Sequence, residues 1–347
     1  MNAKLQTLGK MYSSIIQDDA GSFLFASELF ETPYAELTAN GYFFNEVTGD
    51  LSRGTLNLRG LVDLSDATTV NVNILTHLKY QRILNLVEEG ENFTKANKQA
   101  QKELFTVFGL QKYADTDAAR FSITEGDEGA GALIAISSLL IVDRSEAELT
   151  EYLAKLCREF GQSGTFTDET KRQINSDKEK LYIRLSSIKN NIINRYKKLG
   201  ASVEVKDLAL FLDWDNDGEV GNETLKEGQV VTLEKTELNV PNNGGTYNIK
   251  ITSPIPVYLK PVVGFEEDPS SNVTENSYFA NLYEGITNSN ISLEKNIENY
   301  VLTIKVSPLN SRSSKTTLLC IYDCIGNILE TVSISQEGSK DVSLPKL

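Results

Sequence analysis

The most apolar stretch of the chain is GALIAISSLLIV, residues 131–142. Its side chains are apolar on almost every side of a helical projection, and such a helix is stable in water only when other parts of the protein cover it. A bilayer crossing needs about 20 apolar residues, so this stretch is too short to span a membrane. We therefore predict that residues 131–142 form a central, buried helix and that the chain does not insert into membranes.

Helical spacing of apolar residues continues on both sides of this segment. Ser145 is followed three residues later by Glu148, a pattern that is typical of a capping box and predicts a helix start. The expected helices cover residues 77–89, 94–108, 131–142, 145–159, 167–198 as one helix or two, and 203–212. Together they predict an α-helical bundle over residues 76–212.

Both ends of the chain have the composition of β-strands. Short segments rich in aromatic and β-branched residues, separated by turns with Gly, Asn and Asp, fill residues 1–75 and return in residues 231–338. The alternation in residues 69–74 predicts a half-buried strand. The spacing of the later strands is typical of an antiparallel β-sandwich. We therefore expect a partial β-sandwich in the first region and an Ig-like antiparallel β-sandwich in the second.

The order of these elements predicts an α+β multidomain chain. The expected parts are a partial β-sandwich over residues 1–75, a helical bundle over 76–212, an acidic linker over 213–230, a β-sandwich over 231–338 and a tail over 339–347. The length of 347 residues agrees with several domains, because a single domain usually holds about 150 residues.

Composition argues against several classes of function. The chain has 48 Asp and Glu against 34 Lys and Arg, a formal charge of −14, so it gains nothing from nucleic-acid phosphates and is repelled by anionic lipids. Its one histidine, His77, argues against His-based triads and sites with several imidazole ligands. We expect His77 to be structural and hydrogen-bonded to the backbone. Three cysteines without a CxxC do not support a disulfide framework or a zinc ribbon.

The sharpest local motif is DWDNDGE, residues 213–219. Carboxylates at positions 1, 3 and 5 with glycine at 6 match the start of an EF-hand-type calcium loop, because alternating carboxylates converge on one hard cation. Position 7 can offer its backbone carbonyl. An EF-hand loop has a bidentate Glu at position 12, but position 12 here is Thr224. Glu223, at position 11, supplies this carboxylate only if the register of the loop shifts by one residue. The candidate ligands are Asp213, Asp215, Asp217, Glu219 and Glu223.

This motif leaves two interpretations open. In the first, a structural Ca²⁺ ion binds with an affinity of roughly 0.1–1 mM, as in extracellular modules, and stiffens the joint between the bundle and the C-terminal sandwich. In the second, the segment is a solvated acidic linker whose Asp-Gly turn ends the last helix.

Two short motifs frame the C-terminal strands. Gly244-Gly245-Thr246 precedes a predicted strand, and the pattern Ile-x-Gln-x-Gly closes the region at residues 334–338. Together they resemble the BACON domain of Bacteroidetes surface and secreted proteins. The resemblance implies an Ig-like β-sandwich that contacts glycans or acts as a spacer. Many BACON domains carry Trp in their middle strands, whereas the only Trp of this chain is Trp214.

Without such a tryptophan, a sugar-binding surface needs other flat aromatic side chains. The candidates are Tyr258, Tyr278, Phe279 and Tyr283. Aromatic residues of a β-sandwich also serve as core, so packing between strands is the alternative role for these four.

Residues 21–23, 39–49 and 70–78 carry a second resemblance, to a family of bacterial exported lipoproteins of unknown function. The strand portion is similar to a carboxypeptidase-regulatory-type sandwich, and helices follow it directly. The resemblance implies a protein of the cell surface, as an outer-membrane lipoprotein, or a secreted one. We expect the chain to begin part-way into its first sandwich, with a signal segment and a lipid anchor upstream.

These features predict a non-enzymatic cell-surface or secreted protein that acts in adhesion or carbohydrate binding, with polysaccharides, mucin glycans or a host or cell-surface protein as partner. The alternative is a hydrolase that acts on glycans or peptides with two carboxylates in an interdomain cleft. Its candidate residues are Glu125, Asp127, Glu128 and residues 266–268. The first three directly precede the predicted buried helix, where a turn and favourable interaction with the helix dipole explain them more simply.

Overall fold

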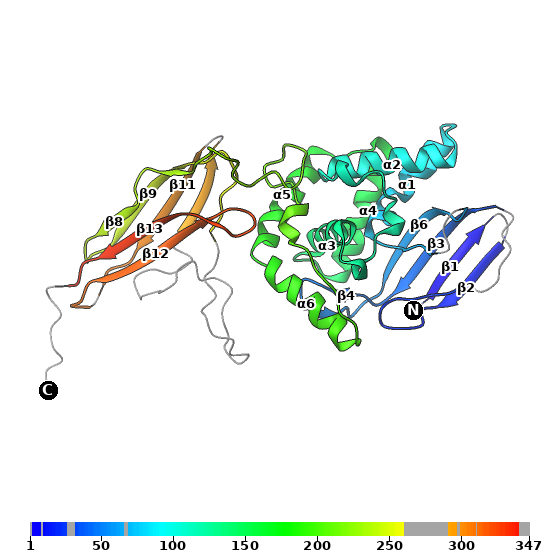
Figure 1. Cartoon of the computed structure of the whole chain (residues 1–347), viewed down its shortest axis with the longest axis horizontal. Coiled ribbons are helices and arrows are strands. Elements are labelled where there is room, and N and C mark those ends of the chain that lie inside the picture. The colour runs from blue at the N-terminus through cyan, green and yellow to red at the C-terminus, as the bar shows by residue number, and fades with distance from the viewer. Residues whose placement is uncertain are drawn as a thin grey trace. The chain divides into compact units, whose positions relative to one another are not determined.

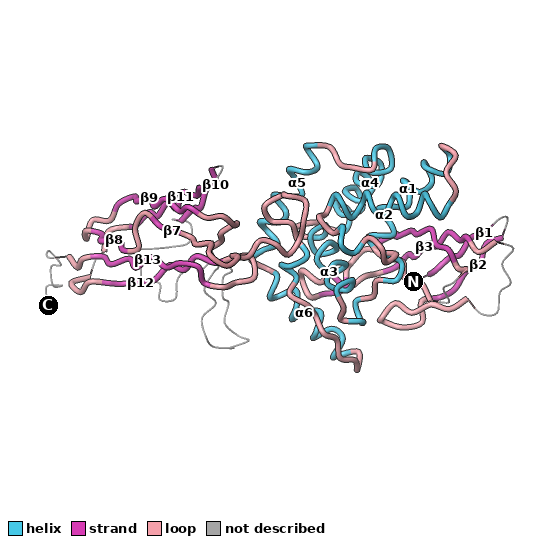
Figure 2. Tube along the Cα trace, turned by 45° about the horizontal axis from the view of Figure 1, so that its top comes forward, coloured by secondary structure: helices cyan, strands magenta, loops and turns pink. Residues whose placement is uncertain are grey.

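A computed structural model of the chain describes residues 2–7, 10–25, 32–65, 69–259, 291–296, 299–309 and 311–339. Helices and strands are both present, so the predicted α+β class is confirmed (Figure 1). The chain divides into two compact units, Met1–Asn222 and Glu223–Leu347. Within the described ranges the helices belong to the first unit, and the second unit is built from strands and loops (Figure 2).

The first unit begins with a four-stranded antiparallel sheet in the order β2-β1-β3-β6. Its strands are β1 (Asn2–Thr7), β2 (Lys10–Ile15), β3 (Tyr34–Gly41) and β6 (Leu56–Asp63), and β4 (Phe44–Asn45) pairs separately with β5 (Asp50–Leu51). Ala35, Leu37 and Val62 are buried in one cluster with Ala119, which follows the second helix in sequence. Sheet and helices therefore share a core in this unit.

The prediction of a strand over residues 69–74 is wrong. These residues lead without strand pairing into helix α1 (Ile74–Glu88). Asn73 caps this helix, because its side chain accepts the Thr76 N–H at 3.0 Å while its own N–H donates to the Thr76 hydroxyl at 2.9 Å. Its Nδ2 also donates to the Ala118 carbonyl at 2.8 Å. This reciprocal cap outweighs the alternating pattern of the segment.

Most of the predicted helices are present, with shifted ends. They are α1 (Ile74–Glu88), α2 (Phe93–Val107), α3 (Glu128–Ile141), α4 (Glu146–Ser163), α5 (Asp168–Tyr182) and α6 (Leu185–Lys198). The capping box of Ser145 and Glu148 is confirmed at the start of α4. The segment 167–198 forms two helices, which meet at Ile183 and Arg184.

Helix α3 is the centre of the first unit, which confirms the prediction for residues 131–142. All of its residues are buried except Glu128 and Ser137. Gly131 lies against Phe211, and Gly129 lies against Phe121 so closely that a Cβ there would be 2.8 Å from the ring. The small residues of α3 thus allow aromatic rings from other segments to approach its backbone.

The predicted helix over residues 203–212 is wrong in type and extent. Only a short 3-10 turn, η4 (Leu208–Phe211), forms there, and the Asp207 side chain caps it. The indole N–H of Trp214 donates to the Ala209 carbonyl at 2.8 Å. In a continuing α-helix the Ala209 carbonyl would accept the backbone N–H of the residue four positions later. Here the indole N–H of Trp214 occupies this carbonyl instead, and the helix does not continue.

A buried polar network joins α1 and α2 to the loop that follows them. The side chain of Lys79 is fully buried, and its ammonium donates to Asp117 Oδ1 at 2.9 Å and to Gln101 Oε1 at 3.0 Å. Asn97 donates to the other oxygen of Asp117 at 2.7 Å. Because a buried charge is tolerated only when it is paired and hydrogen-bonded, this network fixes the loop relative to both helices.

A buried acid lies beside the central helix. Glu46 follows β4 and is 8% exposed. The Ser137 hydroxyl of α3 donates to its carboxyl group, and the Asn191 amide of α6 donates to its backbone carbonyl at 2.9 Å. Burial raises the pKa of Glu46, and the two serine hydroxyls of α3 lower it only in part. Glu46 therefore links the two-stranded pair to α3 and α6.

The second unit contains two sheets. The first has the order β10-β11-β9-β7 and the second the order β12-β13-β8. Their strands are β7 (Thr232–Leu233), β8 (Glu237–Val240), β9 (Gly245–Thr252), β10 (Ile291–Asn296), β11 (Asn299–Val306), β12 (Lys315–Tyr322) and β13 (Ile328–Gln336). The expectation of purely antiparallel strands misses one pair, because β8 runs parallel to β13.

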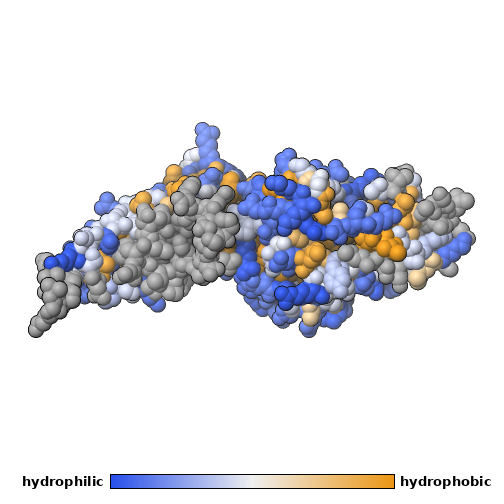
Figure 3. Space-filling view, turned by 90° about the horizontal axis from the view of Figure 1, so that it is seen from below, coloured by the Kyte–Doolittle hydropathy of each residue, from blue (hydrophilic) through white to orange (hydrophobic). Residues whose placement is uncertain are grey.

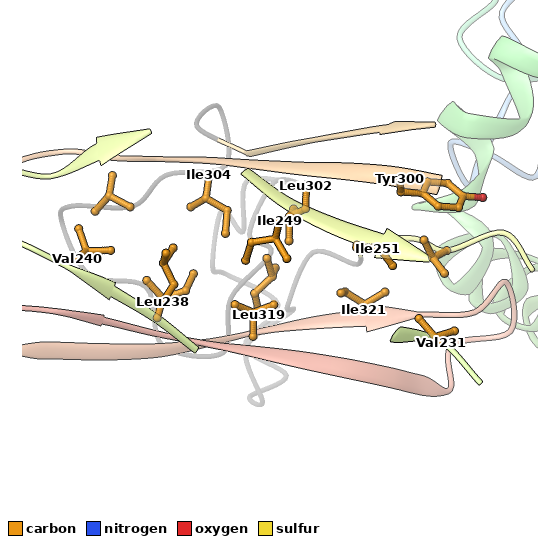
Figure 4. Packing of buried hydrophobic residues seen from close by; sticks show 14 residues of the cluster. Val231, Leu238, Val240, Ile249, Ile251, Tyr300, Leu302, Ile304, Leu319 and Ile321 are labelled. Atoms are coloured by element: carbon orange, nitrogen blue, oxygen red, sulfur yellow. The ribbon is translucent and has the colours of Figure 1, made fainter. Parts of the chain in front are cut away.

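One hydrophobic core fills the space between these sheets. Ile249, Leu302 and Ile304 from the first sheet meet Leu319 and Ile321 from the second, as Figure 4 shows. All five side chains are fully buried. The strands β8, β9, β11, β12 and β13 contribute alternate residues to this core, as the period of two in a strand requires.

Substitution of Gly131 by alanine tests the packing of the central helix. Alanine normally stabilises a helix interior by about 1 kcal/mol relative to glycine. Here the added Cβ overlaps the ring of the buried Phe211, so we expect Gly131→Ala to destabilise the protein by about 1–3 kcal/mol in denaturant unfolding. The double variant Gly131→Ala/Phe211→Leu should recover part of the loss. A more stable Gly131→Ala protein would contradict this packing.

Substitution of Glu46 by glutamine tests the buried acid. A folded-state pKa above the unfolded value means that the stability from this group is present at low pH and is lost as pH rises through the folded pKa. One such proton changes the unfolding free energy by about 1.4 kcal/mol per pH unit in that window. We expect Glu46→Gln to be more stable than the parent at pH 8 and to lose this slope in urea unfolding. Glu125→Gln, at an exposed position, is the matched control and should change neither.

Candidate functional site

The acidic loop at residues 213–222 is held in the first unit by its tryptophan. Trp214 is 7% exposed and packs edge-to-face against Tyr182 of α5, with ring centroids 5.5 Å apart. Its indole bond to Ala209 anchors it to η4. Asp213 and Asp215, on either side of this anchor, remain partly accessible, and Asp217 is exposed. The tryptophan therefore fixes the loop while its carboxylates stay open to solvent.

The three aspartates of the loop converge. Asp213, Asp215 and Asp217 each offer a carboxylate oxygen, and these oxygens all lie within 4.8 Å of one another. Like charges at such distances disfavour one another's ionised forms unless a cation is present. The arrangement matches three oxygen ligands of one hard cation.

The backbone of the loop folds around these carboxylates. Asp213 accepts the N–H groups of Asn216 at 2.6 Å and Gly218 at 3.0 Å, and Asp215 accepts that of Asp217 at 3.1 Å. Asn216 and Gly218 have positive φ angles of 65° and 93°, a conformation that glycine and asparagine adopt most readily. The sequence Asn-Asp-Gly thus supplies the turn that brings the three aspartates together.

A lysine from a neighbouring helix supports the same loop. The ammonium group of Lys178 on α5 donates to the Asp213 carbonyl and, at 2.8 Å, to Asn216 Oδ1. Partial burial raises the pKa of the Asp213 carboxyl, while Lys178 lowers it. Lys178 lies 35 residues before the loop in sequence, and nothing in the motif itself indicates it.

The other two predicted ligands are placed differently. Glu219 is exposed, and its N–H donates to Asp217 at 2.8 Å. Glu223 is buried in the second unit. Asn222, which the motif does not mark, donates its side-chain amide to the second oxygen of Asp217 at 2.7 Å. Within the described part of the chain, the convergent carboxylates are those of the three aspartates.

His77 and Cys157 are held in unreactive states. His77 Nδ1 accepts the backbone N–H of Arg59 at 3.1 Å, which confirms the expected backbone hydrogen bond. Burial and the charge of Arg59 lower the pKa of His77 to about 4. Burial raises the pKa of the Cys157 thiol to about 12. At neutral pH the imidazole is uncharged and the sulfur is a thiol, so this pair lacks the thiolate that nucleophilic catalysis requires.

The carboxylates predicted for a hydrolase do not form a pair in the described part of the chain. Asp127 caps α3 by accepting the Ala130 N–H at 2.8 Å. Glu128 accepts the hydroxyl of Tyr113, and Glu125 is exposed. Residues 266–268 lie outside the described residues.

The aromatic candidates for sugar binding are described at one position. Tyr258 forms a short antiparallel bridge with Tyr322 through two backbone hydrogen bonds of 2.9 Å. Tyr278, Phe279 and Tyr283 lie outside the described residues. Sugar stacking by these four side chains therefore remains a prediction.

No protein-family model matches this chain, and no curated protein matches it. None of the helices in the described ranges combines the length and apolar character that a bilayer crossing requires.

Proposed function

We propose that this chain is a non-enzymatic cell-surface or secreted binding protein and that its loop 213–222 binds a structural Ca²⁺ ion. The observation that carries the calcium site is the convergence of the Asp213, Asp215 and Asp217 oxygens within 4.8 Å. The loop that holds them is already folded by hydrogen bonds from its own backbone.

The chemistry of the donors favours calcium over softer metals. Carboxylate and carbonyl oxygens are ligands for hard cations, whereas zinc and copper sites use imidazole and thiolate. Calcium also accepts irregular geometry and additional water ligands, which suits three side chains from one short loop. The backbone carbonyl of Glu219 is available at position 7 of the motif.

The proposed role of the ion is structural. The loop ends at Asn222, directly before the second unit begins in sequence at Glu223. A cation removes the repulsion among the three aspartates and so fixes the conformation of this connecting segment. Trp214 and Lys178 hold the other side of the loop.

For residues 231–338 we propose a BACON-like, Ig-like β-sandwich. The shared core of the two sheets supports this proposal, and so do the positions of its motif residues. Gly244 has φ of 74° and approaches the backbone of Val306 closely, as Gly338 approaches Arg312. Gln336 is fully buried and donates to the Ser307 carbonyl at 2.9 Å. Both motifs thus occupy positions that hold the ends of strands together.

Adhesion or carbohydrate binding is the activity that we propose for the whole chain, with a polysaccharide, a mucin glycan or a cell-surface protein as partner. The unreactive states of His77 and Cys157 support a non-enzymatic role. The charge of −14 suits a protein exposed to solvent, and hydrophilic residues alternate with smaller apolar patches on the face of the first unit in Figure 3.

Thermal unfolding with and without calcium tests the metal site. At about 5 mM Ca²⁺ and an affinity of roughly 0.1–1 mM, binding stabilises the folded protein by about 1–2 kcal/mol. We expect the melting temperature to rise by about 2–8 °C and to return to its starting value with a chelator. No shift at this concentration would contradict the site.

Variants of the loop identify the ligands in the same assay. Asp215→Asn and Asp217→Asn should abolish the calcium-dependent shift. Without calcium Asp215→Asn should be as stable as the parent or more so, because it removes a repelling charge. Asp217→Asn also gives up one of the two hydrogen bonds that its carboxylate accepts from Glu219 and Asn222. Glu219→Gln is the matched control, since it keeps the backbone carbonyl and lies outside the carboxylate cluster. It should retain the shift.

A glycan array with plant polysaccharides and mucin O-glycans tests the binding function. We expect binding to at least one of these classes and no release of new reducing ends during incubation. Binding to none of them would contradict the carbohydrate part of the proposal. Released reducing ends would contradict its non-enzymatic part.

A further inference from the structure

A cavity of about 570 Å³ enters the first unit between β6, α1 and α4. This volume is in the range of small-molecule sites, which are mostly apolar with a few polar groups. Leu56, Leu153 and Ala154 supply apolar lining, and Tyr80 adds an aromatic ring. The site is separate from the acidic loop, whose residues do not line it.

The charge of this cavity is opposite to that of the chain. Arg59 from β6 and Arg158 from α4 line it, and its lining contains no carboxylate. Among the described residues, neither guanidinium has a carboxylate within the 4.0 Å of an ion pair. Two such arginines at one cavity, in a chain with a net charge of −14, point to a negatively charged ligand.

Arg59 is held in place at the edge of the cavity. Its guanidinium lies 5.5 Å from the centroid of the Tyr80 ring, and its backbone N–H donates to His77 Nδ1 at 3.1 Å. Because Nδ1 is the acceptor, the neutral imidazole carries its hydrogen on Nε2 and is a donor there. The charge of Arg59 also acts on the pKa values of His77, Tyr80 and Cys157, which all line the cavity. Glu36 acts on Tyr80 too, but it is not a lining residue.

Gln81 and Asn85 continue the α1 side of the cavity one and two turns after His77, and they are fixed by hydrogen bonds. Gln81 donates to Asn85 at 2.8 Å, and Asn85 donates to the Gly161 carbonyl of α4 at 2.9 Å. A Cβ at Gly161 would lie 2.7 Å from Gln81 Cγ, so α1 and α4 approach closely at this point. This wall of the cavity is therefore preformed, and a ligand need not order it.

We propose that this cavity binds a small organic carboxylate, with Arg59 and Arg158 supplying the positive charge, His77 Nε2 a hydrogen-bond donor, and the apolar lining contact with the body of the ligand. A carboxylate with an apolar body fits better than a free phosphate, because the lining combines guanidinium groups with leucine and alanine side chains and lacks a glycine-rich anion loop. This site goes beyond the calcium and glycan functions and does not depend on them.

Calorimetric titration of the full chain tests the proposal with defined probes. The probes are benzoate, hexanoate and indole-3-acetate, each paired with its neutral amide, together with inorganic phosphate. We expect at least one carboxylate to bind in the millimolar range or tighter, and its amide and phosphate to bind at least about tenfold more weakly. Equal binding of acid and amide, or no binding of any carboxylate up to about 10 mM, would overturn the proposal.

Variants then assign the charge. Arg158→Gln and Arg59→Gln should each weaken the best carboxylate about tenfold or more without altering the binding of its amide. Arg172→Gln on α5 is the matched control, because Arg172 is exposed and does not line the cavity. An equal loss with Arg172→Gln would assign the effect to net charge and overturn the site. Thermal unfolding of each variant, with an unchanged melting temperature, shows that the cavity is intact.

Discussion

The burial of α3 is the constraint on which the first unit depends. This helix is apolar on nearly all sides, so it must be enclosed, and α1, α4, α5 and the short 3-10 turns at residues 123–125 and 208–211 contact it. Gly129 and Gly131 allow Phe121 and Phe211 to pack against its backbone. Because Phe211 belongs to η4, the same contact places the beginning of the acidic loop. The central helix and the candidate metal site are thus parts of one packing arrangement.

Charged groups in this unit follow two different rules. Lys79 is buried and pairs with the partly exposed Asp117, and the side-chain amides of Gln101 and Asn97 complete this network, so these charges hold segments in place. Asp213 and Asp215 are instead partly accessible, and Asp217 and the two arginines of the cavity are exposed. Accessible charges of one sign, where they outnumber those of the other sign nearby, are favourable sites for an external ion of the other sign. The acidic loop and the arginine cavity are consequently assigned to different ligands.

The sequence determined several local features because their causes lie within a few residues. The apolar circumference of residues 131–142 predicts a buried helix, and Ser145 with Glu148 predicts the start of α4. The spacing of Asp213, Asp215 and Asp217 with Gly218 is enough to predict convergent carboxylates, since the turn that joins them is made by the same six residues. The strands of the second unit follow in the same way from alternation and turn residues.

Only the tertiary structure decided features whose partners are distant in sequence. Residues 69–73 alternate like a strand, yet Asn73 bonds to Ala118 and caps a helix. Residues 203–212 have helical spacing, yet the indole of Trp214 takes the carbonyl that a helix needs. Lys178 reaches the acidic loop from α5, and Arg59 and Arg158 meet at one cavity although 99 residues separate them in the sequence. A local sequence pattern indicates which secondary structure a segment favours by itself, whereas packing against distant segments decides which structure it adopts.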